Sequence, residues 1–237
     1  MTDARERMRR FWDERAEEQP WFYVDNRVSY DDPDLERFWA EGGHDVDTLL
    51  GLAGVAVRSS DVVVDVGCGV GRLTRVLARR AAQVYALDIS ERMLELARRH
   101  NEDLDNVTWV LGDGISLAGV PDAAVDGCVS HVVFQHIPDP AITLGYVREM
   151  GRVLRADGWA AFQVSTNAAI HRPPALRARL RGHLRGGPRG QSDPAWIGSS
   201  VAIEDLGATA NSGGLDLEHV ENEGSQFSVV RLRRRAG

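Results

Sequence analysis

The feature that most constrains the fold is a short apolar run followed by closely spaced glycines. Residues 62–66 read Val-Val-Val-Asp-Val, which is typical of a strand buried on both faces. Gly67, Gly69 and Gly71 follow at alternate positions, and glycines there let the backbone turn tightly and approach a ligand closely. A helical pattern begins directly after them. The segment therefore predicts a strand, a ligand-binding turn and a helix.

Strand and helix patterns go on alternating after this turn. Further strands are predicted over residues 83–87, 107–111, 125–130 and 159–164. Helices are predicted between them, one capped by Ser90 and one begun by Asp139-Pro140. Two last strands, over 215–220 and 227–232, predict an antiparallel pair. Such alternation predicts an α/β fold with a parallel sheet covered by helices, and ligands bound beyond the carboxyl ends of the strands.

Composition divides the chain into regions. Residues 1–50 are acidic and hold half of the chain's 16 aromatic residues, which predicts an N-terminal helical cap. Residues 51–237 are then the main α/β domain. Within this domain residues 167–198 are basic and rich in Gly and Pro, and we expect a mobile insertion there.

Composition also excludes several classes of function. All 28 basic residues are arginine, so no lysine is present for a Schiff base or a phosphate loop. The net charge of −7 argues against nucleic acid as the partner. Cys68 and Cys128 are too few for a four-cysteine zinc site, and we expect two buried free thiols. No apolar run reaches membrane-spanning length and the first residues resemble no leader, so we expect a cytoplasmic protein.

Three carboxylates lie where three successive predicted strands end, namely Asp65, Asp88 and Asp113. A nicotinamide cofactor is disfavoured, because its G-x-G-x-x-G pattern needs a small third residue and Arg72 holds that position. Asp65 also puts a negative charge where a pyrophosphate would lie. The site favours a ligand with a cationic amine, with Asp88 accepting from ribose hydroxyls and Asp113 from an adenine amino group.

These features resemble the class I S-adenosylmethionine-dependent methyltransferases of the small-molecule type. The similar segments are residues 62–72, 87–90, 112–114, 126–131 with 136–139, and 154–159. The resemblance spans roughly residues 55–235 and implies a Rossmann-like sheet of order 3-2-1-4-5-7-6 with strand 7 antiparallel. It also implies S-adenosyl-L-methionine as the cofactor and S-adenosyl-L-homocysteine as the product.

The same resemblance implies a set of cofactor-binding residues. They are Asp65, Gly67, Cys68, Gly69, Gly71, Arg72, Asp88, Ile89, Met93, Asp113, Gly114, Ile115, Ser130 and His131. The methyl group is activated by the cofactor's own sulfonium, so the protein has to align the acceptor with it and exclude water.

Candidate catalytic and acceptor residues come from two places. His131 and His136 flank the end of the fourth strand, and histidine is the natural general base near pH 7. We expect His131 to face the methyl group, with packing or a cofactor contact as the alternative; His136 is a second candidate, with structuring of the loop as its alternative. Trp21, Tyr23 and Arg27 resemble part of the mobile caps of small-molecule methyltransferases, so with His136 they are candidate acceptor contacts. Ordinary helix packing is the alternative for the aromatic residues.

The expected function is methyl transfer to an oxygen or nitrogen atom of a small-molecule acceptor, in secondary metabolism. The basic residues 171–189 keep a second interpretation open, an RNA or protein methyltransferase that docks through them. A non-catalytic S-adenosylmethionine-binding protein is a third. No metal is expected, because the histidines lack the spacing of ligands. The acceptor and the oligomeric state stay open.

Overall fold

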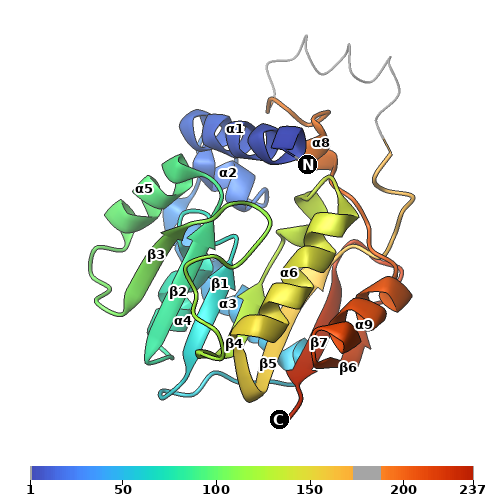
Figure 1. Cartoon of the computed structure of the whole chain (residues 1–237). Helices are drawn as coiled ribbons and strands as arrows, with labels where there is room; N and C mark the ends of the chain where they lie inside the picture. The colour runs from blue at the N-terminus through green and yellow to red at the C-terminus, as the bar shows by residue number, and fades with distance from the viewer. Residues whose placement is uncertain (1, 173–187, 237) are drawn as a thin grey trace.

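A single sheet of seven strands forms the centre of the computed structural model, which describes residues 2–172 and 188–236 (Figure 1). The strands are β1 (Val62–Val66), β2 (Gln83–Asp88), β3 (Val107–Leu111), β4 (Val125–Ser130), β5 (Leu154–Val164), β6 (Leu215–Glu221) and β7 (Ser228–Arg234). Their order is β3-β2-β1-β4-β5-β7-β6, and β7 runs antiparallel to both neighbours. The predicted fold class, strand order and antiparallel strand are confirmed.

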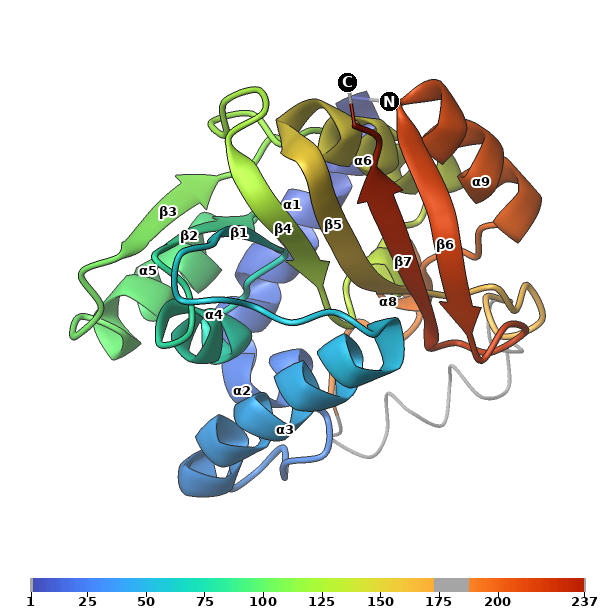
Figure 2. The ribbon, with the colours of Figure 1, turned by 90° about the horizontal axis from the view of Figure 1, so that it is seen from below.

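Helices cover both faces of this sheet (Figure 2). They are α3 (Leu35–Ala53), α4 (Arg72–Ala78) and α5 (Glu91–His100) on one face, and α6 (Pro140–Val153) and α9 (Ile203–Ser212) on the other. Because successive side chains of a strand point to opposite faces, Val63 joins the core cluster of Leu77, whereas Val64 joins that of Val147. β1 is thus buried on both sides, as its continuous apolar run predicts.

Four short or terminal elements gather over the carboxyl ends of the parallel strands (Figure 1). These are α1 (Thr2–Glu18), α2 (Pro20–Val24), η1 (Phe134–His136) and α8 (Pro194–Ile197). The Asp13 carboxylate of α1 accepts a 2.7 Å hydrogen bond from Ser90 Oγ, and the Trp12 ring lies edge-on to His136. The N-terminal residues therefore close the end of the sheet at which ligands are expected.

Local signals place several element boundaries. Ser90 accepts from Met93 N–H at the start of α5, and Asp139 accepts from Ala141 N–H at the start of α6, so both predicted caps are confirmed. β5 begins earlier than predicted, at Leu154 rather than Trp159, because Leu154 already pairs with Val125 before the register shifts.

Other sequence-based expectations concern the domain boundary, the basic segment and the cysteines. The boundary at residue 50 falls inside α3, which packs against α4 through Gly42 and continues to Ala53. Of the basic segment 167–198, residues 173–187 lie outside the described part of the chain. Cys68 and Cys128 are both buried free thiols, as expected.

Among the helices described within 2–172 and 188–236, none combines the length and apolar character needed to cross a membrane.

Candidate active site

The glycine turn between β1 and α4 forms one wall of a pocket at the carboxyl end of the sheet. Gly67 and Gly69 have φ of 75° and 54°, in the left-handed region that favours glycine. A Cβ on Gly67 would lie 2.5 Å from a methyl carbon of Val133, and one on Gly69 would lie 3.0 Å from a methyl carbon of Val24. Both the backbone conformation and the space therefore require glycine, and the turn is packed between the β4–η1 connection and the cap.

A half-buried carboxylate stands next to this turn. Asp88 ends β2, and its two oxygens accept from Gly69 N–H at 2.8 Å and Ser90 N–H at 2.9 Å. Burial raises the pKa of Asp88 to about 6. A carboxylate has about four lone-pair directions, so after these two bonds Asp88 can still accept from two further donors in the pocket.

Seven of the predicted cofactor-binding residues line this cofactor pocket. They are Gly67, Gly69, Asp88, Ile89, Met93, Gly114 and His131. The pocket is closed from the cap side by Met8, Trp12, Tyr23 and Val24, which the motifs do not include. The aromatic-rich N-terminal segment predicts such a cap, but it does not show that Trp12 lines the pocket.

The other predicted cofactor residues do not line the pocket. They are Asp65, Cys68, Gly71, Arg72, Asp113, Ile115 and Ser130. Several of them bond inside the protein: Asp65 accepts a 2.6 Å hydrogen bond from Thr74 Oγ1, and Ser130 Oγ donates to Val66 O. Asp113 accepts from the N–H groups of Ile115 and Ser116 and caps its own loop. These residues shape the walls of the pocket from behind.

A second and larger cavity, of about 1550 Å³, lies next to the cofactor pocket. Its walls come from the cap helices, the β4–η1 connection, the end of β5, residues 188–197 and the turn before β7. Five residues line both cavities: Tyr23, Val24, His131, Val132 and His136. A molecule in the larger cavity would therefore meet a ligand of the cofactor pocket across this common wall, and we call the larger cavity the acceptor pocket.

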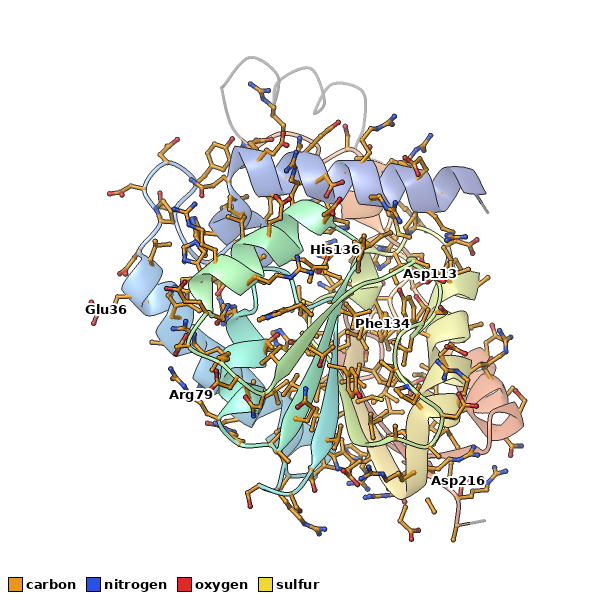
Figure 3. The ribbon with its side chains drawn as sticks, turned by 60° about the vertical axis from the view of Figure 1, so that its left-hand side comes forward. Glu36, Arg79, Asp113, Phe134, His136 and Asp216 are labelled. Atoms are coloured by element: carbon orange, nitrogen blue, oxygen red, sulfur yellow. The ribbon has the colours of Figure 1, made fainter. Side chains whose placement is uncertain are left out.

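His136 projects from η1 toward the underside of α1 (Figure 3). Its Nδ1 lies 2.8 Å from the carbonyl oxygen of Trp196. Because a carbonyl oxygen only accepts, Nδ1 carries the proton and Nε2 keeps its lone pair. The ring is tilted against Trp196 at 5.1 Å and meets Trp12 edge-on at 5.8 Å. Burial lowers the pKa of His136 to about 4, so the imidazole is neutral at pH 7.

His131 stands on the same wall, beside a cluster of ion pairs. Burial lowers the pKa of His131 to about 4. Arg27 contacts Asp25 at 2.7 Å and Asp45 at 2.6 Å, and the buried Arg72 contacts Asp45 at 2.7 Å. Burial opposes the charge of Asp45, yet hydrogen bonds from Arg27 and the charge of Arg72 outweigh it and lower the pKa of Asp45. The cluster joins α2 and α3 to the first residue of α4.

Tyr23, Arg27 and His136 line the acceptor pocket, but the fourth predicted acceptor residue, Trp21, does not. The Trp21 ring instead packs edge-on against Phe38 at 5.2 Å. Two residues along a helix turn through about 200°, so Trp21 and Tyr23 face opposite sides of α2. Phe11 of α1 also lines the acceptor pocket.

Comparisons with known proteins agree with this architecture. A family model described as a methyltransferase domain matches residues 64–162. The ubiquinone biosynthesis O-methyltransferase of Neisseria meningitidis serogroup A is 30% identical over 207 residues, 82% of each chain. The demethylmenaquinone methyltransferase of Tropheryma whipplei is 33% identical over 104 residues, which are 44% of this chain and only 41% of that relative.

Solved structures show the same fold. Haemonchus contortus phosphoethanolamine N-methyltransferase 1, determined with phosphoethanolamine and S-adenosylhomocysteine, superposes with a TM-score of 0.67 and 16% identity. The match covers 99% of this chain and 49% of that one. The sheet order, the glycine turn and these relatives together show that the chain belongs to the class I S-adenosylmethionine-dependent methyltransferases.

The residues of the cofactor pocket fit the cofactor of that family, S-adenosyl-L-methionine. Gly67 and Gly69 line the pocket without side chains, so their backbone is accessible to a ligand there. Asp88 is half-buried, lines the pocket and keeps acceptor capacity suited to two ribose hydroxyls. The apolar side chains of Ile89 and Met93 line the same pocket and suit the flat face of an adenine.

Proposed function

We propose that this chain transfers the methyl group of S-adenosyl-L-methionine to an oxygen atom of a small-molecule acceptor. The observation that carries the proposal is the wall shared by the cofactor and acceptor pockets, on which two neutral histidines stand. Oxygen is favoured over nitrogen because the hydroxyl of an acceptor needs a group to take its proton. The naming of the Neisseria relative as an O-methyltransferase supports the same choice.

His136 is the group that takes this proton in the proposed reaction. A cofactor held by Gly67, Gly69 and Asp88 would supply a methyl group on a sulfonium, and the sulfur would be released as a neutral thioether when the acceptor oxygen bonds to the methyl carbon. The hydroxyl proton passes to Nε2 of His136, and the carbonyl oxygen of Trp196 holds the ring and stabilises the Nδ1–H. The geometry of a base oriented by a third group is thus present, with the acceptor as the remaining partner.

The other residues of the common wall bind and exclude water. His131, which lines both pockets, positions the acceptor beside the methyl group, while Tyr23 and Arg27 form the cap side of the acceptor pocket. The cap residues Met8 and Trp12 cover the cofactor pocket and keep water out. Transfer in secondary metabolism stays a prediction, because the acceptor pocket alone does not name its molecule.

The test is a labelling experiment with the full chain. Purified protein is incubated with methyl-labelled S-adenosyl-L-methionine and an extract of the source cells, and products are separated by size. We expect label in the low-mass fraction, and none with a His136→Gln variant that still binds S-adenosyl-L-homocysteine. Label on RNA or protein would overturn the small-molecule proposal, and cofactor binding without any transferred label would indicate a non-catalytic binding protein.

A further inference from the structure

The connection between β4 and η1 contains a backbone conformation that its sequence disfavours. Val132 has φ of 57°, in the left-handed region. Three other non-glycine residues of the described chain share a positive φ, namely Ala123, Asp157 and Asn222, and none of these is β-branched. A β-branched residue with positive φ is a genuine outlier. Such strain persists only where the surroundings hold it, and it gathers at functional sites.

A side chain from the neighbouring strand holds this residue. Val132 N–H donates a 3.2 Å hydrogen bond to Oε1 of Gln163 on β5. Gln163 is the one polar residue in the apolar run over residues 159–164, and it is half-buried. The buried side of such an amide loses water on folding and needs a hydrogen-bond partner within the protein. The bond to Val132 meets that need and fixes the turn at the same time.

The turn at Val132 lines both pockets. Val132 lies on their common wall, and Gln163 lines the acceptor pocket but not the cofactor pocket. The next residue, Val133, lines the cofactor pocket, and its methyl groups fill the space in front of Gly67. A short chain of contacts therefore leads from Gln163 through the strained turn to the glycine loop.

We propose that Gln163 is a positioning residue that sets cofactor affinity from the acceptor side. Its Oε1 holds Val132 in the left-handed conformation, and this keeps Val133 seated against Gly67. Without that acceptor the turn relaxes to a negative φ, Val133 shifts, and the cofactor pocket changes shape. The inference rests on the proposed function only in taking S-adenosyl-L-homocysteine as a ligand of the cofactor pocket.

Coupling of this kind acts in both directions, because binding free energies are linked. If Gln163 helps the cofactor to bind by ordering the turn, then the bound cofactor also orders the turn. The amide proton of Val132 is therefore expected to exchange with solvent more slowly when S-adenosyl-L-homocysteine is bound. Removing the Gln163 acceptor is expected to speed that exchange in the ligand-free protein.

The test combines calorimetry with S-adenosyl-L-homocysteine and amide hydrogen exchange on the full chain. Gln163→Leu is expected to weaken binding by about 5- to 20-fold with little change in melting temperature, as coupling energies of this kind do. Gln163→Glu keeps an acceptor oxygen for Val132 N–H and is expected to stay within about 3-fold of the wild type. Gln226→Leu, in the same pocket on the turn before β7, is the matched control and is expected to bind normally.

A double variant separates positioning from other roles of Gln163. Glycine adopts positive φ without strain, so Val132→Gly is expected to restore most of the affinity that Gln163→Leu loses. Unchanged affinity in Gln163→Leu, or a loss that Val132→Gly leaves untouched, would overturn the proposal. If the wild type did not bind S-adenosyl-L-homocysteine, the assigned cofactor would be wrong. Hydrogen exchange would still test the positioning role, because an unchanged exchange rate of the Val132 amide proton in ligand-free Gln163→Leu would overturn it.

Discussion

The cofactor pocket and the acceptor pocket share a wall but are built by different means. The floor of the cofactor pocket is backbone: the glycine turn after β1 is held between strands, with Gly67 and Cys68 both donating to the carbonyl oxygen of Leu87. The acceptor pocket is built from side chains on segments far apart in the sequence, from Phe11 to Phe227. Ion pairs and single hydrogen bonds hold its walls, as Arg27 shows between Asp25 and Asp45.

The two pockets therefore differ in how well they tolerate amino-acid substitutions. A backbone turn packed on both sides has no alternative arrangement, since interiors are close-packed and an added methyl group has nowhere to go. A wall of partly exposed side chains can lose one contact and keep the others. We therefore expect abrupt losses from substitutions at the glycine turn and graded losses from substitutions around the acceptor pocket.

The largest effect is expected at Gly67. Gly67→Val puts a β-branched residue at φ of 75° and its Cβ 2.5 Å from a methyl carbon of Val133. We expect S-adenosyl-L-homocysteine binding to fall more than about 1,000-fold by calorimetry, since strain and overlap are combined. Gly43→Ala is the control: no atom lies within 4 Å of an added Cβ there, so binding is expected to be unchanged and stability slightly increased. If folded Gly67→Val still bound S-adenosyl-L-homocysteine measurably, the glycine turn would tolerate substitutions no less than the acceptor pocket does.

The second effect is on turnover and concerns the shared wall. His136→Gln removes the Nε2 lone pair in its present position, and loss of a general base typically lowers kcat by about 100-fold or more. The expected signature is a fall in kcat for the acceptor found by labelling, with the dissociation constant of S-adenosyl-L-homocysteine within about 3-fold of the wild type. His131→Ala is expected to lower turnover more than cofactor affinity as well. Equal turnover in either variant would remove that histidine from the reaction.

The cofactor side was accessible to sequence reasoning because its signals are local. The apolar strand, the alternating glycines and the acid that ends β2 lie within one βαβ unit, so Gly67, Gly69 and Asp88 follow from strand-end geometry. The same rule also selects Asp65 and Asp113, which do not line the pocket. The position of an acid at a strand end does not show its hydrogen-bond partner, which is Thr74 for Asp65 and the following loop for Asp113.

The acceptor side could not be derived in this way. The pairing of Arg72 with Asp45 joins residues 27 positions apart on two helices, and no periodicity in the chain links them. Which aromatic residue of the cap faces inward depends on how α1 and α2 pack across the strand ends. Trp21 therefore looked like a pocket residue, and Gln163 could be noticed only as an isolated polar residue in an apolar strand.

A third effect tests the Asp88 carboxylate of the cofactor pocket. Asp88→Asn replaces an oxygen that accepts from N–H by an amide nitrogen, so we expect S-adenosyl-L-homocysteine affinity to fall about 10- to 100-fold. In the wild type the affinity should also decline as the pH falls through about 6, because Asp88 must be ionised to accept from two hydroxyls. The measurement is calorimetry between about pH 5 and 8. A decline of equal size in Asp88→Asn would assign it to another group, of which Asp65 is the first candidate.

The same carboxyl has an opposite effect on the stability of the ligand-free protein. Asp88 loses its proton at about pH 3.8 when unfolded and at about 6 when folded, so the folded chain holds the extra proton between these values. Raising the pH through that window should lower the free energy of unfolding by up to about 3 kcal/mol. Thermal melts of the wild type and Asp88→Asn across this range are expected to differ most above pH 6, with the variant less sensitive. Parallel pH profiles would show that Asp88 is ionised throughout.

The smallest effect is expected from Tyr23→Phe on the cap. The Tyr23 hydroxyl lies 2.9 Å from Glu18 Oε1 and 2.9 Å from the carbonyl oxygen of Arg189, and Glu18 keeps Tyr30 and Arg15 as partners when Tyr23 changes. We expect the free energy of unfolding to fall by about 1 kcal/mol and the acceptor KM to rise a few-fold, with S-adenosyl-L-homocysteine affinity unchanged. Because Tyr23 lines both pockets, this variant is also the most sensitive test of whether the cofactor and acceptor pockets are separate sites. If Tyr23→Phe weakened cofactor binding as strongly as Asp88→Asn, the cap would contribute to the binding free energy of the cofactor. The two pockets would then have to be treated as one site.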